Sequence, residues 1–99
     1  MAKHTKPRRK RFINILGVKV KIKYTTKVLY DDDTELDGCY CHETKTIFVS
    51  LHSDVKSTIL HESLHSALAI SGCGNLINMK TEETIVQALE SALKDFFVF

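Results

Sequence analysis

The chain has 99 residues, the length of one small domain, and 43% of them are hydrophobic, which is enough for a single core. No apolar run approaches the roughly 20 residues of a membrane-spanning helix, and no signal-peptide-like apolar stretch follows the basic N-terminus. The three cysteines are an odd number, which argues against a disulfide framework and is typical of a reducing compartment. We therefore expect a domain in the cytoplasm of a cell or of a host cell.

The formal net charge of +2 is unevenly distributed along the chain. Residues 1–11 hold six of the 14 basic side chains and no acidic one, so the remaining residues carry a formal charge of −4. We predict a basic, flexible arm over residues 1–11 and a single domain over residues 12–99. Such an arm either only solubilises the chain or makes weak contact with nucleic acid or an acidic partner through long-range attraction.

The first half of the chain predicts β-strands. An apolar stretch covers residues 12–16, and residues 18–24 alternate strictly between apolar and lysine side chains, as in a strand with one buried face. Residues 31–38 are acidic and end in a turn signal, so they predict a loop. A short strand over residues 39–42 and a β-branched strand over residues 46–51 are predicted to follow.

The second half of the chain predicts two amphipathic helices. Ser53 is a suitable N-cap for the first, which should cover residues 54–71 and stop at the glycines that follow. Thr81 is predicted to cap the second, which should end near Phe97. The apolar stripe of this second helix predicts its buried face; its members are Ile85, Val86, Leu89, Ala92, Leu93 and Phe96.

The first predicted helix carries the sequence His61-Glu62-Ser63-Leu64-His65, a His-Glu-x-x-His motif. With five histidines in the chain, about 0.015 chance matches are expected. Residues four apart share a helix face, so the two imidazoles can bind one metal ion while the glutamate reaches a metal-bound water. Zinc suits this arrangement because catalytic zinc has three protein ligands and an open position. The motif predicts metal-assisted hydrolysis, usually of a peptide bond, with Glu62 as general base.

The third zinc ligand has to lie outside the motif. Metzincins extend it by a glycine and a third histidine, but Leu68 and Ser71 occupy those positions, so that class is excluded. The common alternative is a glutamate from the following helix. The apolar stripe of that helix is centred close to Glu82, so we predict Glu82 as the third ligand, with Glu83 and Glu90 as alternatives.

Two other sets of residues are less informative. Cys39 and Cys41 are spaced as Cys-x-Cys with no second pair, so reduced cysteines that serve as small packing residues are predicted instead of a structural metal site. Stabilisation of a developing oxyanion would need a Tyr, His or Arg near the metal. Tyr24, Tyr40 and His42 are candidates, and the sequence does not choose among them.

The order of these features resembles a known family. The stretches that carry the resemblance are Gly38-Cys39-Tyr40, Ile47-Phe48-Val49, Leu60-His61-Glu62-Ser63-Leu64-His65-Ser66-Ala67-Leu68 and Glu82-Glu83-x-x-Val86-x-Ala88-Leu89. Together they resemble the minimal gluzincins, very small zinc metallopeptidases found in phages and prophages, and more distantly the ImmA/IrrE-like and SprT-like peptidases. The resemblance covers residues 12–97, and its specific parts are the helix motif and the glutamates that follow.

The resemblance implies an α+β fold, with a small antiparallel-type sheet of about three strands packed on two helices and zinc between them. It implies His61 and His65 as ligands and Glu62 as general base, with an extended peptide or protein substrate pairing at the sheet edge near residues 39–41. We expect no extra domains of the kind that select a substrate in larger members. The alternatives are therefore a weak or inactive zinc-binding module with a protein or nucleic-acid partner, and a structural protein without metal.

Overall fold

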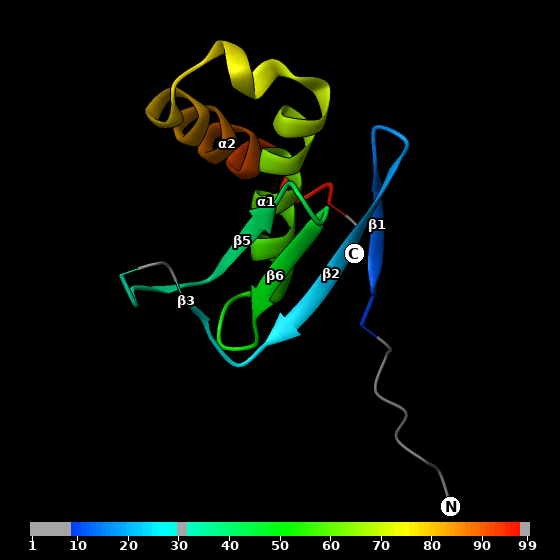
Figure 1. Cartoon of the computed structure of the whole chain (residues 1–99), viewed down its shortest axis with the longest axis vertical. Helices are drawn as coiled ribbons and strands as arrows, with labels where there is room; N and C mark the ends of the chain where they lie inside the picture. The colour runs from blue at the N-terminus through cyan, green and yellow to red at the C-terminus, as the bar shows by residue number, and fades with distance from the viewer. Residues whose placement is uncertain (1–8, 30–31, 98–99) are drawn as a thin grey trace, which may run out of the picture.

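The computed structural model describes residues 9–29 and 32–97, and it confirms the predicted α+β class (Figure 1). In chain order the elements are β1 (Phe12–Ile15), β2 (Val18–Thr25), β3 (Val28–Leu29), β4 (Glu35–Leu36), β5 (Gly38–Cys41), β6 (Thr46–Ser50), α1 (Val55–Ser71), a 3-10 turn (Cys73–Leu76) and α2 (Met79–Leu93). Neither described helix has the length and apolar character needed to cross a bilayer. Most of the predicted basic arm, residues 1–8, lies outside the described residues, so its contact with nucleic acid stays a prediction.

The main sheet has the strand order β1-β2-β6-β5 and mixes parallel with antiparallel pairs. β1 and β2 form an antiparallel hairpin, β2 and β6 run parallel, and β5 pairs antiparallel with β6 at the sheet edge. Its four strands agree with the expected sheet of about three strands, and the parallel pair of β2 with β6 differs from the expected antiparallel type. The acidic stretch predicted as a loop also contains β4, which pairs with β3 in a separate two-stranded ribbon.

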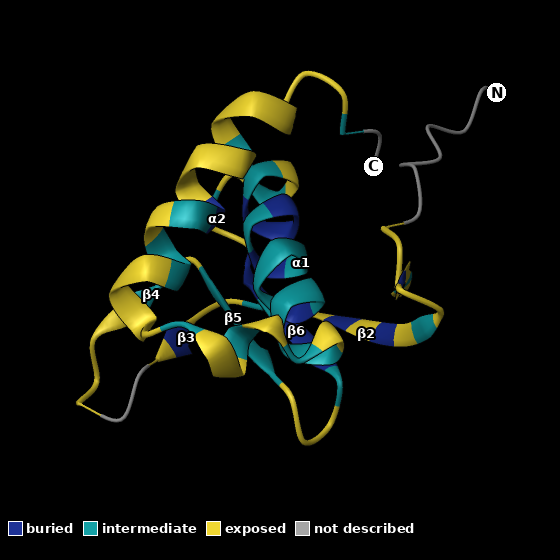
Figure 2. Cartoon of the chain, turned by 90° about the horizontal axis from the view of Figure 1, so that it is seen from above, coloured by how far each residue is buried: buried dark blue, intermediate teal, exposed yellow. Residues whose placement is uncertain are grey.

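The core lies between the main sheet and α1, and α2 packs mainly against α1 (Figures 1 and 2). The alternating pattern of β2 is confirmed, because Val20 and Ile22 are buried while the intervening lysines are exposed. Ile47 and Val49 of β6 and Ile59 of α1 complete the centre of the core. This packing places α1 directly beside the edge strand β5, which positions the histidine motif next to an open edge of the sheet.

The caps of both helices differ from those predicted. Asp54, and not Ser53, is the N-cap of α1, and its side chain accepts a hydrogen bond from the Ser57 N–H at 3.2 Å. Asn78, and not Thr81, caps α2, because its side-chain oxygen accepts a hydrogen bond from the Thr81 N–H at 2.8 Å. Thr81 therefore lies inside the first turn of α2. The helix also ends at Leu93, before the predicted end near Phe97.

The predicted apolar stripe of α2 is not its buried face. Of its six side chains only Val86 is buried, and Phe96 is 79% exposed. Figure 2 shows that most of α2 is exposed. The helix is instead turned so that Glu82, Glu83 and Glu90 contact the histidines of α1. α2 is thus rotated about its own axis relative to the orientation that its apolar residues predict, and its carboxylates form hydrogen bonds with the imidazoles of α1.

Candidate metal centre

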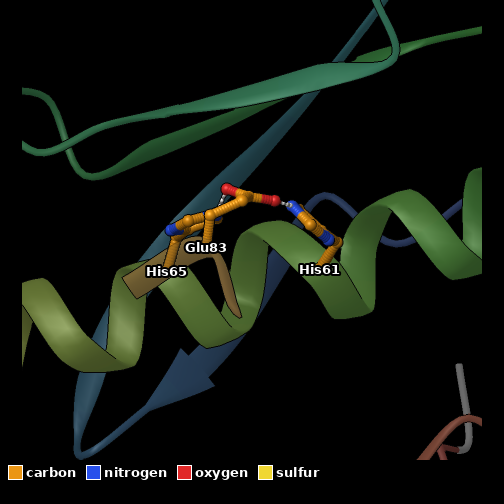
Figure 3. A group of neighbouring side chains, drawn as sticks. All are labelled: His61, His65 and Glu83. Atoms are coloured by element: carbon orange, nitrogen blue, oxygen red, sulfur yellow. Dashed lines mark hydrogen bonds and ion pairs between the residues drawn. The ribbon is translucent and has the colours of Figure 1, made fainter. Parts of the chain in front are cut away.

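His61 and His65 lie one helical turn apart on the side of α1 that faces α2 (Figure 3). Their ring centroids are 5.0 Å apart, and Glu83 of α2 lies between them. Glu83 Oε1 is 3.0 Å from His61 Nε2, and Glu83 Oε2 is 3.0 Å from His65 Nε2. One donor atom from each of the three residues lies within 4.8 Å of the others. Among residues 9–29 and 32–97, this is the group of His, Cys, Asp and Glu side chains that could hold a metal ion.

The Nδ1 atoms of the two histidines meet two other glutamates of α2. Glu90 Oε1 lies 2.7 Å from His61 Nδ1, and Glu82 Oε2 lies 2.6 Å from His65 Nδ1. Glu83, one of the two alternative candidates for the third ligand, therefore contacts the Nε2 atoms of both histidines. Glu82, the predicted third ligand, contacts Nδ1 on the other side of the His65 ring. Glu82 does face α1, as its position near the centre of the apolar stripe predicted, and its assignment as the third ligand stays a prediction.

The hydrogen bond between His61 and Glu90 affects the pKa of both groups. Burial lowers the pKa of His61, but the hydrogen bond to Glu90 and the negative charges nearby outweigh it, so this pKa is raised overall. Burial raises the pKa of Glu90, but hydrogen bonds from Ser57 and His61 outweigh it, so this pKa is lowered overall. Both directions favour the charged forms of His61 and Glu90 relative to the isolated groups.

Glu62, the glutamate of the motif, is buried beneath β5 and is only 8% exposed. Burial raises the pKa of its carboxyl group; the charges of His65 and His61 oppose this rise, while neighbouring carboxylates add to it. A carboxylate with a raised pKa is better matched to taking up and returning a proton near neutral pH. The environment of Glu62 therefore suits a general base.

Gly38 allows β5 to lie close to α1 at the level of Glu62. A Cβ atom at this position would lie 2.6 Å from Thr58 Cγ2 and 2.7 Å from the Phe48 carbonyl oxygen. We expect Gly38→Ala to lower the free energy of unfolding by about 1–3 kcal/mol, because overpacking forces the strand and helix apart. Urea unfolding measures this change, with Gln87→Ala on the exposed side of α2 as the control. An unchanged midpoint for Gly38→Ala would contradict the close packing.

A cleft of about 580 Å³ runs between β5 and the two helices, and both motif histidines and Glu62 line it. Of the three candidates for oxyanion stabilisation, Tyr40 is the one that lines this cleft, and its hydroxyl lies 3.0 Å from His42 Nδ1. Tyr24 does not line the cleft, and its hydroxyl instead donates a hydrogen bond to the main-chain carbonyl of Lys10, two residues before β1. The structure therefore favours Tyr40, with His42 beside it, over Tyr24.

Sequence reasoning missed two residues that shape this site. Ser57 donates a hydrogen bond to Glu90 Oε2 at 2.7 Å, and Gly38 gives the strand its close approach. A signal for Ser57 was present, because Ser57, His61 and His65 repeat at four-residue intervals and so share one face of α1. The three cysteines are free, with Cys39 and Cys41 half-buried.

No protein-family model, no curated protein and no solved structure matches this chain. The resemblance to minimal gluzincins therefore stays a hypothesis. A function has to be argued from the donor groups of the site, their spacing and the cleft beside them.

Proposed function

We propose that the protein is a zinc-dependent metallopeptidase in which His61, His65 and Glu83 bind the metal and Glu62 is the general base. The observation that carries this proposal is the convergence of both histidine Nε2 atoms on Glu83, beside a buried Glu62. Two imidazoles and one carboxylate are the ligand set of thermolysin-type catalytic zinc. The two histidines and the base also have the spacing that this chemistry requires on one helix.

The donor atoms suit zinc better than the hard cations. Magnesium and calcium prefer oxygen ligands, whereas imidazole nitrogen favours zinc and related transition metals. Ligand atoms at 2.0–2.1 Å around a tetrahedral ion lie roughly 3.3 Å from one another. The donor atoms here lie within 4.8 Å of one another, so small side-chain rotations would bring them to a single ion.

Different residues of the cleft would have different roles in peptide hydrolysis. Bound zinc would supply a Lewis acid that lowers the pKa of water and polarises a carbonyl group. Glu62 would accept a proton from the attacking water and return it to the leaving amine. Tyr40 would donate a hydrogen bond to the developing oxyanion. The free edge of β5 would bind the peptide as an added strand, which holds the scissile bond over the motif helix.

The proposal predicts cleavage that depends on zinc. Protein loaded with one equivalent of zinc should generate new termini in a mixed peptide library, detected by mass spectrometry. Removal of the metal by a chelator should abolish this activity, and zinc, but not magnesium, should restore it. Elemental analysis should find one zinc per chain. Stoichiometric zinc without cleavage of any peptide would favour the binding-module alternative, and an absence of stoichiometric zinc would overturn the metal site itself.

A further inference from the structure

Glu82 and Glu90 contact the histidines on the side away from Glu83. Each of these two carboxylates approaches one Nδ1 atom, at 2.6 Å for Glu82 with His65 and 2.7 Å for Glu90 with His61. We infer that Glu82 and Glu90 are positioning residues, which accept the Nδ1–H of the two metal-binding histidines and so leave each Nε2 atom for the metal. This inference rests on the proposed zinc site.

The protonation of an imidazole ring explains why such partners matter. A neutral imidazole carries its proton on one nitrogen only, and the other nitrogen then has the lone pair that binds a metal. A carboxylate can only accept, so it fixes the proton on the nitrogen that it contacts. The Nδ1 contacts are shorter than the 3.0 Å contacts of Glu83 with the Nε2 atoms. In a neutral, metal-bound ring the proton is therefore best held on Nδ1, with Nε2 left for the metal beside Glu83.

The two positioning carboxylates are themselves held in place. Glu90 Oε2 accepts a hydrogen bond from the Ser57 hydroxyl at 2.7 Å, and Ser57 lies one turn before His61 on the same helix face. Glu90 thus joins two points of α1, which restrains its carboxylate plane relative to the imidazole. Glu82 lies against Gly74, where a Cβ atom would be only 3.0 Å from Glu82 Oε1. The glycine therefore leaves room for the carboxylate in the position that His65 requires.

Zinc affinity provides the first test. Competition with a chromophoric chelator would give zinc dissociation constants for wild type, Glu82→Gln, Glu90→Gln and the control Glu43→Gln, which changes an exposed acid in the turn after β5. The first two changes are expected to weaken zinc binding by about 10–100-fold each, and the control should leave it unchanged. Ser57→Ala, which keeps every glutamate, should also weaken zinc binding, by a smaller factor, through Glu90.

Imidazole ¹⁵N NMR of the zinc-loaded protein provides a readout that general destabilisation would not mimic. Wild type should show Nδ1–H protons on both rings, protected from exchange with water. Glu90→Gln should speed exchange at His61 and leave His65 protected, and Glu82→Gln should do the reverse. Protons on Nε2 in zinc-loaded wild type, or unchanged zinc affinity in both glutamine variants, would overturn the inference and leave the proposed function standing. A wild type that binds no zinc would overturn both.

Discussion

Glu62→Gln is expected to lower the rate of peptide cleavage by about 10²–10⁴-fold while zinc stays bound. The amide has nearly the shape of the carboxylate, so it fits the same buried position beside Gly38. It cannot accept the proton of the attacking water. Cleavage rates and zinc content measured on the same preparations separate the two roles, with Glu43→Gln as the exposed control.

The same variant has an expected effect on stability. A folded-state pKa raised above the unfolded value gives a contribution that is present at low pH and is lost as the pH rises through the folded value. Ionisation of Glu62 therefore costs stability in the metal-free protein, and this cost grows as the pH rises through the folded-state pKa. Glu62→Gln should have an equal or higher melting temperature than wild type at pH 7. A variant that unfolds, or one that still cleaves peptides at the wild-type rate, would contradict the role of Glu62.

Glu83→Ala is expected to remove stoichiometric zinc from the protein. It deletes the carboxylate that contacts both Nε2 atoms, so the ion would keep only two protein ligands. The loss of affinity should exceed the roughly 10–100-fold expected for an outer partner such as Glu82. Elemental analysis after desalting and chelator competition measure the difference, with Glu82→Ala as the matched neighbour on the same helix turn.

The comparison of these two neighbours decides which glutamate is the ligand. Loss of zinc in Glu82→Ala with retention in Glu83→Ala would return the assignment to the residue that the apolar pattern favoured. The pair is well suited to this test because both side chains are partly exposed, at 27% and 44%, and neither contributes to the apolar core. Their removal should therefore change zinc binding more than folding.

The elements that could be predicted are those whose pattern lies within one continuous stretch of the sequence. The alternation of β2 follows from one buried face, and the end of the motif helix follows from the glycine that caps it. The predicted apolar face of that helix is only partly observed, because its buried residues include Thr58, Glu62 and Ser66. The positions of His61, Glu62 and His65 relative to one another need only the geometry of a helix. The parallel pairing of β2 with β6 could not be predicted, because it depends on how three intervening strands lead the chain back to the sheet.

The contact that each glutamate of α2 makes with the histidines was harder to predict, because it depends on the rotation of α2 about its own axis. The apolar pattern of this helix points Leu89 and Phe96 inward, but the sheet is small and α2 reaches little beyond α1. Its carboxylates Glu82, Glu83 and Glu90 contact the two imidazoles. Apolar patterning does not include such paired polar contacts, so it placed Glu82 on the inward face but did not predict that Glu83 would contact both Nε2 atoms.

Because α2 buries little apolar surface, a metal ion bound between the two helices would affect its stability. Val86 is the only buried side chain that α2 contributes, so apolar contact holds this helix weakly. An ion bound by two side chains of α1 and one of α2 would act as a cross-link between the helices, and its binding energy would become folding energy for α2. Loss of the ion would then release α2 before the sheet, in the manner of local unfolding. Zinc supply would thus govern the susceptibility of this helix to proteolysis, and with it the lifetime of the protein.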